Sequence, residues 1–288
     1  MHFTKMHGIG NDFVMVNCLG ADGPALLAEA QKHAVLLCDR KFGVGGDGVI
    51  ALLPGQAGAF KMRMFNPDGS EAEMCGSGIR CFAKFLFDRG LMHGQSEISV
   101  ETGAGLLHLQ ITAGPDGKAE MVRVDMGEPV LKPSQIPTVL SEGDAPIINA
   151  PLVLGDLTLG VTAVSMGNPH AVTFVGDVQS YPVESVGPQV EHHPAFPRRT
   201  NTEFIQVVSG REIIFRVWER GAGATLACGT GACAAVVACV LNGKTGREVL
   251  VHLPGGDLEI DWSEADNHVY MTGPAAEVFE GELLFSAP

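Results

Sequence analysis

Two cysteines begin the same short sequence in the two halves of the chain. Cys75-Gly76-Ser77-Gly78 and Cys228-Gly229-Thr230-Gly231 lie 153 residues apart, and each leads into an apolar segment with helical spacing. The free backbone N–H groups at a helix start attract an anion and favour the thiolate form of a nearby cysteine. Because glycine has no side chain, a ligand can approach such a backbone closely. Each sequence therefore predicts a thiol beside an anion-binding helix start.

Two equivalent sites predict a more specific chemistry than one. If both helix starts grip one carboxylate, a thiol stands on each face of the neighbouring carbon. One thiolate then removes a proton as general base, and the other thiol delivers a proton to the opposite face as general acid. The pair predicts stereoinversion next to a carboxylate, with Cys75 and Cys228 as the acid/base residues. The remaining cysteines are interpreted as small buried hydrophobic residues: Cys18, Cys38, Cys81, Cys233 and Cys239.

Residues near the two cysteines break the symmetry between the halves. Glu219 precedes Cys228 by nine residues at the end of an alternating strand, whereas the matching position before Cys75 is Asn66. His170, whose imidazole titrates near neutral pH, is a candidate partner for Cys75. Asn66 and His170 both stand in Asn-Pro sequences, which by themselves indicate ordinary turns.

The elements that must position these residues form a duplicated pattern. Alternating segments predict strands at residues 13–16, 48–53, 60–65, 106–111 and 121–125, and at 161–165, 171–175, 203–208, 212–218, 249–253 and 257–262. Helical spacing predicts helices over residues 25–39, 77–89 and 230–241. The third has no charged residue, so it should be buried on every side. Buried helices among many strands predict sheets curled around central helices.

The 153-residue offset extends beyond the cysteines. It also matches Arg63 with Arg216, Phe65 with Trp218, and Gly90 with Gly243. One offset thus links a strand, a loop and a helix end in both halves, which indicates a duplicated unit related by a pseudo-twofold axis. Five prolines crowd residues 129–151 and indicate the boundary between the halves.

Composition excludes several classes of protein. The length of 288 residues suggests two domains, and a net charge of −14 disfavours binding to nucleic acid or an anionic membrane. The longest wholly apolar run, residues 232–241, is half the ~20 residues of a membrane span. Seven cysteines without a C-x-x-C pair disfavour a zinc site or a full disulfide framework. We expect a cytoplasmic protein with reduced thiols and no metal.

These motifs together resemble the diaminopimelate epimerase family over nearly the whole chain. The matching segments are residues 6–13 (MHGIGNDF), 42–48 (FGVGGDG), 65–70 (FNPDGS), 75–81 (CGSGIRC), 167–170 (GNPH), 199–204 (RTNTEF), 219–221 (ERG) and 228–231 (CGTG). Each is weak alone, but their joint order and spacing are specific.

The resemblance implies a mixed α/β (α+β) fold of two pseudosymmetric domains, each a curled, mostly antiparallel sheet around a central buried helix. The N-terminal domain would comprise residues 1–128 plus 275–288, including a returning strand at 277–285, and the C-terminal domain residues 129–274. The family interconverts LL- and meso-2,6-diaminoheptanedioate in lysine and peptidoglycan precursor biosynthesis without pyridoxal phosphate, metal or nucleotide, and the resemblance suggests a homodimer.

The resemblance also implies roles for individual residues. Cys75 and Cys228 would be the two acid/base residues, assisted by His170 and Glu219. Backbone amides would bind the reacting α-carboxylate at Gly76, Ser77, Gly229 and Thr230. The remaining substrate contacts would come from Asn11, Asn66, Asn168, Asn201 and Arg220, the last by gripping the distal carboxylate, with Glu219 also beside the substrate.

Two positions depart from the family pattern. Ser77 stands where the family usually has Asn, and Gly48 where many members have Gln. Serine keeps the backbone N–H and a hydroxyl donor, so we expect activity to survive, while substrate preference is the property that these positions could alter.

Three alternatives remain open at the level of sequence. The first is a racemase of another amino acid, of the proline, hydroxyproline or histidine type; Arg220 disfavours it, because a substrate without a distal carboxylate would leave a buried guanidinium unpaired. The second is a dithiol redox protein that joins Cys75 and Cys228 reversibly. The third is an amino acid binder without catalysis.

Overall fold

The computed structural model describes residues 1–284 and divides into two compact units. Unit 1 comprises Met1–Val124 and the described residues from Gly273 to 284, and unit 2 comprises Asp125–Thr272. The domain limits expected from the sequence, at residues 128/129 and 274/275, lie a few residues from these divisions and stay predictions for the protein's functional domains. Among the described residues, no helix has the length and apolar character needed to cross a membrane.

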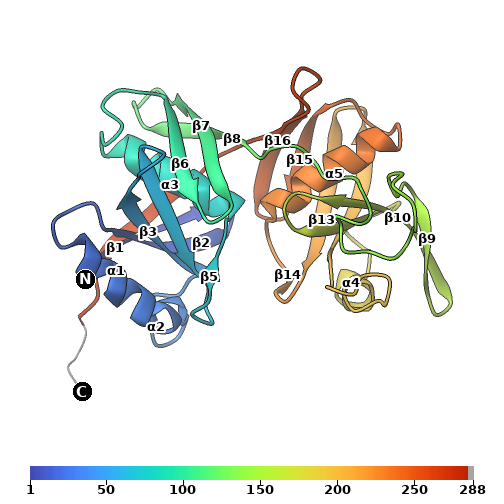
Figure 1. Ribbon diagram of the computed structural model, residues 1–288, viewed down its shortest axis with the longest axis horizontal. Coiled ribbons are helices and arrows are strands. Elements are labelled where there is room, and N and C mark those ends of the chain that lie inside the picture. Colours follow the sequence, from blue (N-terminus) through green and yellow to red (C-terminus); the bar gives the residue numbers. More distant parts are fainter. Residues whose placement is uncertain (285–288) are drawn as a thin grey trace. The chain divides into compact units, whose positions relative to one another are not determined.

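Unit 1 is a sheet that surrounds one helix and carries two more on its outer side (Figure 1). Its strands are β1 (His2–Gly8), β2 (Asn11–Asn17), β3 (Gly48–Pro54), β4 (Phe60–Phe65), β5 (Glu71–Ala72), β6 (Glu97–Thr102), β7 (Gly105–Ala113), β8 (Ala119–Asp125) and β18 (Ala276–Glu282). Its helices are α1 (Gly23–Lys32), α2 (Ala34–Cys38) and α3 (Gly76–Asp88).

Unit 2 repeats this plan. Its strands are β9 (Ala150–Leu154), β10 (Leu157–Ser165), β11 (Pro169–Phe174), β12 (Asn201–Ser209), β13 (Glu212–Glu219), β14 (Gly223–Ala224), β15 (Glu248–Leu253), β16 (Gly256–Trp262) and β17 (Val269–Gly273). Its helices are α4 (Val183–Glu191) and α5 (Gly229–Leu241).

Strand pairing is the same in the two units and confirms the predicted duplication. In unit 1, β2 runs parallel to β3, β3 antiparallel to β4, and β4 parallel to β6. In unit 2, β11 runs parallel to β12, β12 antiparallel to β13, and β13 parallel to β15. Helices α3 and α5 begin and end at the predicted offset of 153 residues, and Gly90 and Gly243 follow them with positive φ, as glycine permits at a helix end.

The outermost strand of each unit has a different origin. In unit 1, β1 pairs antiparallel with β18, so the predicted return of the C-terminal strand to the N-terminal unit is confirmed for residues 276–282. In unit 2, β10 pairs instead with the strand just before it, β9. The expected strand end, Phe285, lies outside the described residues.

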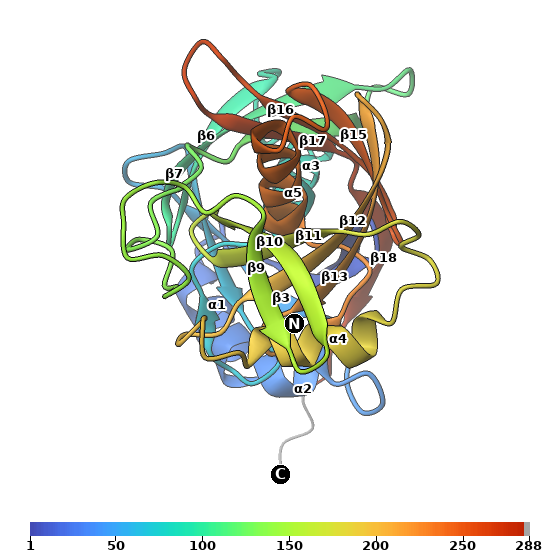
Figure 2. The same cartoon turned by 90° about the vertical axis from the view of Figure 1, so that its right-hand side faces the viewer.

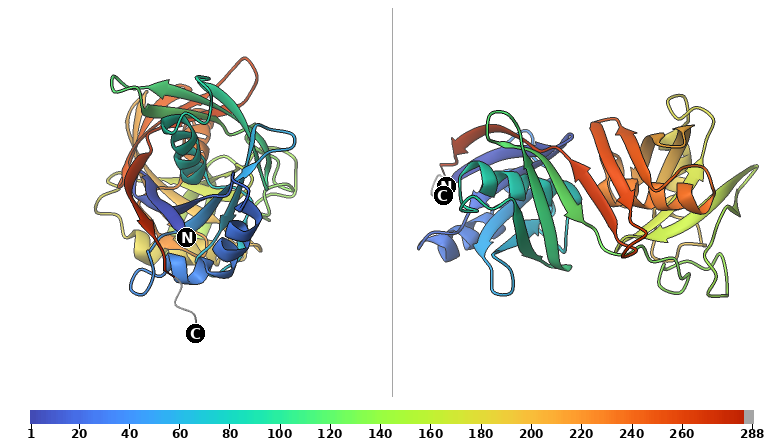
Figure 3. Two further views of the ribbon diagram at one scale, coloured as in Figure 1. Left: turned by 90° about the vertical axis from the view of Figure 1, so that its left-hand side faces the viewer. Right: turned by 90° about the horizontal axis from the view of Figure 1, so that it is seen from above.

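The central parallel strands are buried on both faces. Phe13, Val14, Met15 and Val16 of β2 are all buried, because α3 packs on one side of the sheet while α1 and α2 pack on the other (Figure 3, left). In unit 2, α5 contacts β10, β11 and β12, whereas α4 packs against β12, β13 and β14 (Figure 2). Helix α5 is buried from Gly231 to Cys239, as its uncharged sequence predicts.

Two of the helix predictions need correction. The segment expected as one helix over residues 25–39 breaks at His33, whose φ of −104° and ψ of 11° leave the helical region, and α2 then packs against β3. Helix α4 was missed because Pro182 and Pro188 resemble loop signals. Pro182 precedes the first turn and Pro188 lies within the helix, where packing against β13 supports it.

The three charged residues of α3, Arg80, Lys84 and Asp88, have largely buried side chains. Lys84 forms an ion pair of 2.8 Å with Asp88 and donates to the carbonyl of Ala119, and Asp88 accepts from the Ala119 N–H. Arg80 has no exposed surface, and its Nη1 donates to the carbonyl of Gly76 at 3.2 Å. These contacts fix α3 to β8 and tie down the first turn that follows Cys75.

Candidate active site

Both predicted acid/base cysteines occupy the N-cap position of a central helix. Cys75 caps α3 with φ −144° and ψ 119°, and Cys228 caps α5 with φ −133° and ψ 107°. Neither thiol makes the side-chain capping bond that Ser or Asp makes at such a position. The cysteines therefore stand at equivalent helix starts within their own units, and Gly76, Ser77, Gly229 and Thr230 form the first turns.

Cys75 is partly exposed and lies next to the start of strand β2. The Nδ2 of Asn11 is 3.9 Å from its sulfur. Ser77 is buried, and a side chain on Gly8 would meet its Cβ at 3.1 Å, so this helix start packs closely against the end of β1. The structure thus places two predicted substrate-contacting residues, Asn11 and Ser77, around Cys75.

An ionic network joins two of the segments that carry the family resemblance, residues 6–13 and 42–48. Asp12 accepts hydrogen bonds from Lys5 at 2.5 Å and from Arg40, which also binds Asp47 at 2.8 Å. The backbones interlock as well, because the N–H of Asp47 donates to the carbonyl of Asp12 at 2.7 Å. The network joins residues 6–13 to residues 42–48 and so fixes Asn11 beside Cys75.

Cys228 is more deeply buried than Cys75. Cys228 is 6 % exposed, and Thr230 Oγ1 lies 3.6 Å from its sulfur. Burial raises the pKa of the Cys228 thiol well above its usual value, and the charges of Glu219 and Glu203 raise it further. Burial and the two carboxylates thus oppose the thiolate form at Cys228, and the expectation that a helix start favours the thiolate stays a prediction.

His170 lies inside β11 and is fully buried, not in a solvated loop. Its Nδ1 is 2.6 Å from Oε1 of Glu203, and its Nε2 is 3.0 Å from Oδ1 of Asn168. Asn168 in turn donates from Nδ2 to Thr230 Oγ1 at 3.3 Å. Within unit 2, His170 is thus linked to the helix start of Cys228; its predicted partnership with Cys75 stays a prediction.

The segment after β13 carries Glu219 and Arg220. Glu219 accepts a hydrogen bond from the hydroxyl of Thr225. Asn201 accepts from the Arg220 N–H at 2.9 Å and donates to the carbonyl of Pro169 at 2.9 Å, so its amide is occupied by the protein. The Arg220 guanidinium donates to the carbonyl of Arg198 at 3.3 Å. Asn201 therefore orients the backbone at Arg220.

Asn66 lies in the turn that its Asn-Pro-Asp-Gly sequence predicts. Its carbonyl accepts from the N–H of Gly69, which has φ +83°, and its Nδ2 donates to Ser70 Oγ at 2.9 Å.

Two glycines near the cysteines accommodate the protein's own atoms. A Cβ on Gly78 would meet Ile50 at 2.7 Å, and one on Gly231 would meet Glu203 Oε1 at 3.0 Å and Cys228 Sγ at 3.1 Å. Close packing of each helix start against its neighbours thus also favours glycine at these positions, and their role in leaving space for a ligand stays a prediction. Gly76 and Gly229 are the first helical residues, where backbone amides are available as donors.

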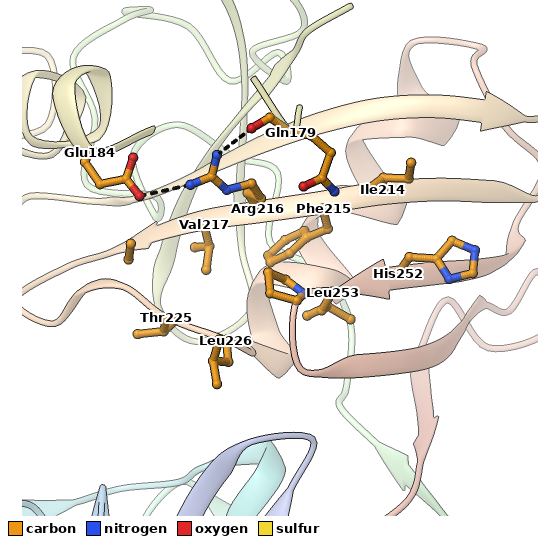
Figure 4. Close-up of a pocket in the computed structure, with 12 residues that line it drawn as sticks. Gln179, Glu184, Ile214, Phe215, Arg216, Val217, Thr225, Leu226, His252 and Leu253 are labelled. Atoms are coloured by element: carbon orange, nitrogen blue, oxygen red, sulfur yellow. Dashed lines mark hydrogen bonds and ion pairs between the residues drawn. The ribbon is translucent and has the colours of Figure 1, made fainter. Parts of the chain in front are cut away.

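A groove of about 500 Å³ lies on unit 2 beside β13 and residues 224–226 (Figure 4). It is lined by Arg216, Thr225, Leu226 and His252, among others. Arg216 is already bound to Glu184 at 2.9 Å and to the carbonyl of Tyr181, so its charge is neutralised locally. In residues 1–284, no group of three or more His, Cys, Asp or Glu side chains is arranged to hold a metal ion.

The sequence alone missed Glu203 as a member of this site. It occurs in the segment 199–204 but was given no role, because a charged residue in a strand usually marks the solvent face. The available signal was its position directly before the apolar pair Phe204-Ile205 in a strand buried from Asn201 to Ile205.

Solved structures share this fold at low sequence identity. A probable proline racemase from Agrobacterium radiobacter K84 has a TM-score of 0.71 at 16% identity, covering 99% of this chain and 93% of that chain. A hydroxyproline epimerase from Agrobacterium vitis has a TM-score of 0.71 at 16% identity, covering 98% and 90%. A PhzF-family phenazine biosynthesis protein from Bacillus anthracis has a TM-score of 0.68 at 18% identity, covering 99% of both chains. The chain therefore has the fold of this group, with a helix-capping cysteine in each unit.

Sequence comparison identifies the family within that group. The diaminopimelate epimerase family model matches residues 3–132 and 162–278. The diaminopimelate epimerase of Desulfitobacterium hafniense is 56% identical, covering 100% of this chain and 99% of its own, and that of Moorella thermoacetica is 54% identical, covering 98% and 99%. The chain belongs to the diaminopimelate epimerase family.

Proposed function

We propose that this protein interconverts LL- and meso-diaminopimelate. The observation that carries the proposal is the cysteine at the N-cap of the central helix in each duplicated unit, in a chain that matches diaminopimelate epimerases along its whole length. Diaminopimelate is an amino acid with a carboxylate at each end, so it offers one carboxylate to the helix starts and a second to a cationic side chain.

The proposed reaction is a proton exchange at the α-carbon. The bond from the α-carbon to hydrogen breaks, the proton passes to one cysteine thiolate, and the electron pair moves into the α-carboxylate. The thiol of the other cysteine then gives its proton to the opposite face of the carbon, which inverts the centre. Atoms and charge balance without pyridoxal phosphate or a metal.

Helix-start amides stabilise the charge that develops on the carboxylate. The N–H groups of Gly76, Ser77, Gly229 and Thr230 belong to the first turns of α3 and α5, where backbone N–H groups have no partner within the helix. Donors fixed in advance stabilise a transition state more than water does, because they need no reorganisation.

The two thiols begin the reaction with different roles. Burial and two carboxylates raise the pKa of Cys228, which favours Cys228 as the acid and Cys75 as the base in the first turnover. Glu219 assists at Cys228 and His170 at Cys75. After one turnover the proton has moved between the cysteines, and the enzyme is ready for the reverse reaction.

The rest of the substrate meets polar side chains. Asn11, Asn66 and Asn168 bind the amino groups and the distal portion, and Arg220 binds the distal carboxylate in a charge-assisted contact. Asn201 contributes by holding the backbone at Arg220.

The same proposal includes the protein's setting. The seven free cysteines favour a reducing compartment, so the enzyme acts in the cytoplasm. It works as a homodimer, as its family resemblance suggests, and sedimentation of the purified protein tests that statement.

Exchange of the α-proton with solvent tests the function. Reduced enzyme is incubated in D₂O with either isomer, and deuterium at the α-carbon is followed together with the ratio of isomers. We expect deuterium in the epimerised product. Proline, hydroxyproline and histidine run in parallel, and exchange with one of these but not with diaminopimelate would refute the proposal in favour of another racemase. Dithiol turnover without any exchange would indicate a redox protein.

A further inference from the structure

Glu203 is a buried carboxylate that the sequence gave no role. It lies in β12 with no exposed surface, and Oε1 is 2.6 Å from Nδ1 of His170. The other oxygen, Oε2, is also buried and has no hydrogen-bond partner among residues 1–284. An unsatisfied buried oxygen costs free energy, so a residue that retains one calls for an explanation.

Strand register brings Glu203 and His170 together. The parallel pairing of β11 with β12 sets His170 opposite Asn201 and Val172 opposite Glu203. Residues two apart point to the same face of a strand, so His170 and Glu203 are diagonal neighbours. Helix α5, which begins after Cys228, packs against both strands.

A chain of contacts leads from Glu203 to the Cys228 thiol. His170 Nε2 is 3.0 Å from Asn168 Oδ1, and Asn168 Nδ2 donates to Thr230 Oγ1 at 3.3 Å. The Thr230 hydroxyl is 3.6 Å from the Cys228 sulfur. Glu203 and Cys228, the two ends of this chain of contacts, also approach each other. A Cβ added to Gly231 would lie about 3 Å from both Glu203 Oε1 and Cys228 Sγ.

The contacts define where the protons lie. Since Asn168 Oδ1 can only accept, His170 carries a hydrogen on Nε2. The short contact between His170 Nδ1 and Glu203 Oε1 then holds one proton. This proton lies either on Glu203 as a carboxylic acid or on Nδ1 of a His170 imidazolium. Both arrangements leave the pair neutral. Burial raises the pKa of Glu203 and favours the acid, while the charge of His170 opposes this.

We propose that Glu203 is a positioning residue of the Cys228 site. It holds His170 with Nε2–H directed at Asn168, and through Asn168 it fixes the Thr230 hydroxyl beside the thiol. The inference rests on the proposed epimerase function, in which Cys228 is one of the two acid/base residues.

Two polar substitutions separate geometry from charge. Glu203→Gln keeps the length of the side chain, and its amide N–H₂ can donate to Nδ1 as the carboxylic acid does. Glu203→Asp keeps the carboxyl group but withdraws the oxygen from His170. We expect kcat to stay within about 3-fold of wild type for Gln and to fall about 10–100-fold for Asp, with KM changed less than about 3-fold in both, as for other residues that orient a reactive group.

Coupling to Thr230 distinguishes a connected chain from a general loss of packing. Thr230→Val removes the hydroxyl, and we expect the Glu203→Asp/Thr230→Val double variant to have about the kcat of the slower single variant. Glu212→Asp is the matched control, because Glu212 forms a partly buried contact of 2.8 Å with His252 in the same unit; its kcat should match wild type.

Nitrogen NMR of the His170 ring provides a readout that does not depend on turnover. The Nε2–H form should persist in Glu203→Gln and mix with the other tautomer in Glu203→Asp.

Two results would overturn the inference. One is that Glu203→Asp and Thr230→Val lower kcat multiplicatively in the double variant. The other is a Glu203→Asp variant with wild-type kcat and an unchanged His170 ring. If wild type and Glu212→Asp are both inactive on diaminopimelate, the proposed function fails, and the ring spectra alone decide whether Glu203 positions His170.

Discussion

The two helix-capping cysteines differ in their surroundings although their sequences are nearly identical. Cys75 is partly exposed and has the amide of Asn11 nearby, whereas Cys228 is buried among Thr230, Glu219 and Glu203. A two-base reaction needs one thiolate and one thiol at the same time. At the residue level, burial and the two carboxylates raise the pKa of Cys228 and so favour its thiol form.

The raised pKa of Cys228 predicts its reactivity toward alkylating agents. The thiolate is the reactive form, and the thiol pKa lies well above the usual value near 9. Alkylation of Cys228 by iodoacetamide should therefore rise about tenfold per pH unit from about pH 7 to about pH 9 without a plateau. Mass spectrometry of the peptide containing Cys228 measures this rate.

A charge variant provides the control for that experiment. Glu219→Gln removes a negative charge that raises the Cys228 pKa, so alkylation at a fixed pH should be faster in this variant than in wild type. A plateau in wild type below pH 9, or a slower reaction in Glu219→Gln, would show that Cys228 is not held as a thiol by these carboxylates.

Asp12 anchors the elements around Cys75. Its side chain is 16 % exposed, and although burial acts to raise its pKa, hydrogen bonds from Arg40 and Lys5 outweigh burial and hold the pKa well below its usual value. A carboxyl with a lowered folded-state pKa stabilises the fold above its unfolded pKa, and this stability is lost as pH falls toward the folded pKa.

We therefore expect Asp12→Asn to lower the free energy of unfolding at pH 7 by about 1–3 kcal/mol. The difference from wild type should shrink as pH falls from about 5 to about 2, where wild-type Asp12 also begins to lose its charge. Urea unfolding at several pH values measures both. A difference that stays constant with pH would mean that the charge of Asp12 does not stabilise unit 1.

Helix α4 packs on β13 through a glycine. A Cβ on Gly187 would meet the Cβ and Cγ of Trp218 at 2.4 Å, which is too close for any side chain. Gly187→Ala should lower the free energy of unfolding by about 1–3 kcal/mol, because α4 must move away from the sheet. Gly176→Ala is the control, since nothing lies within 4 Å of its added Cβ. Equal stability of the two variants in urea would contradict this packing.

The sequence predicted those elements whose local pattern and burial agree. Helices α3 and α5 were each placed within one residue of their true start, because a mostly apolar segment with helical spacing and a glycine after its end leave little choice. Helix α4 could not be found, since Pro182 and Pro188 oppose it locally and only contacts with the sheet support it. The break at His33 likewise depends on how α2 packs against β3.

The candidate site was predictable in part for the same reason. The repeat identified Cys75 and Cys228, since two nearly identical motifs at one offset are a signal within the sequence itself. The pairing of His170 with Glu203 was not predictable, because Glu203 reaches it only through the register of β11 and β12. The role of Gly231 also emerges only from the packing of α5 against Glu203 and Cys228.

At the scale of the whole molecule, the duplication provides two copies of a sheet with a central helix that starts at a cysteine. Each unit has a parallel strand pair with helices on both faces, and its central helix starts at a cysteine. Each copy has since acquired its own surroundings: an ionic network and Asn11 in unit 1, and the chain from Glu203 to Thr230 in unit 2. A symmetric pair of thiols made unequal by its surroundings suits a reaction that inverts a carbon centre in both directions.

Single cysteine variants test this account most directly. Cys75→Ala and Cys228→Ala each remove one proton carrier while leaving the other helix start intact. With either diaminopimelate isomer in D₂O, the reduced wild-type enzyme should form epimerised product that carries deuterium at the α-carbon, and each variant should form none above background. Epimerisation by either variant at a rate near that of wild type would contradict the two-thiol reaction.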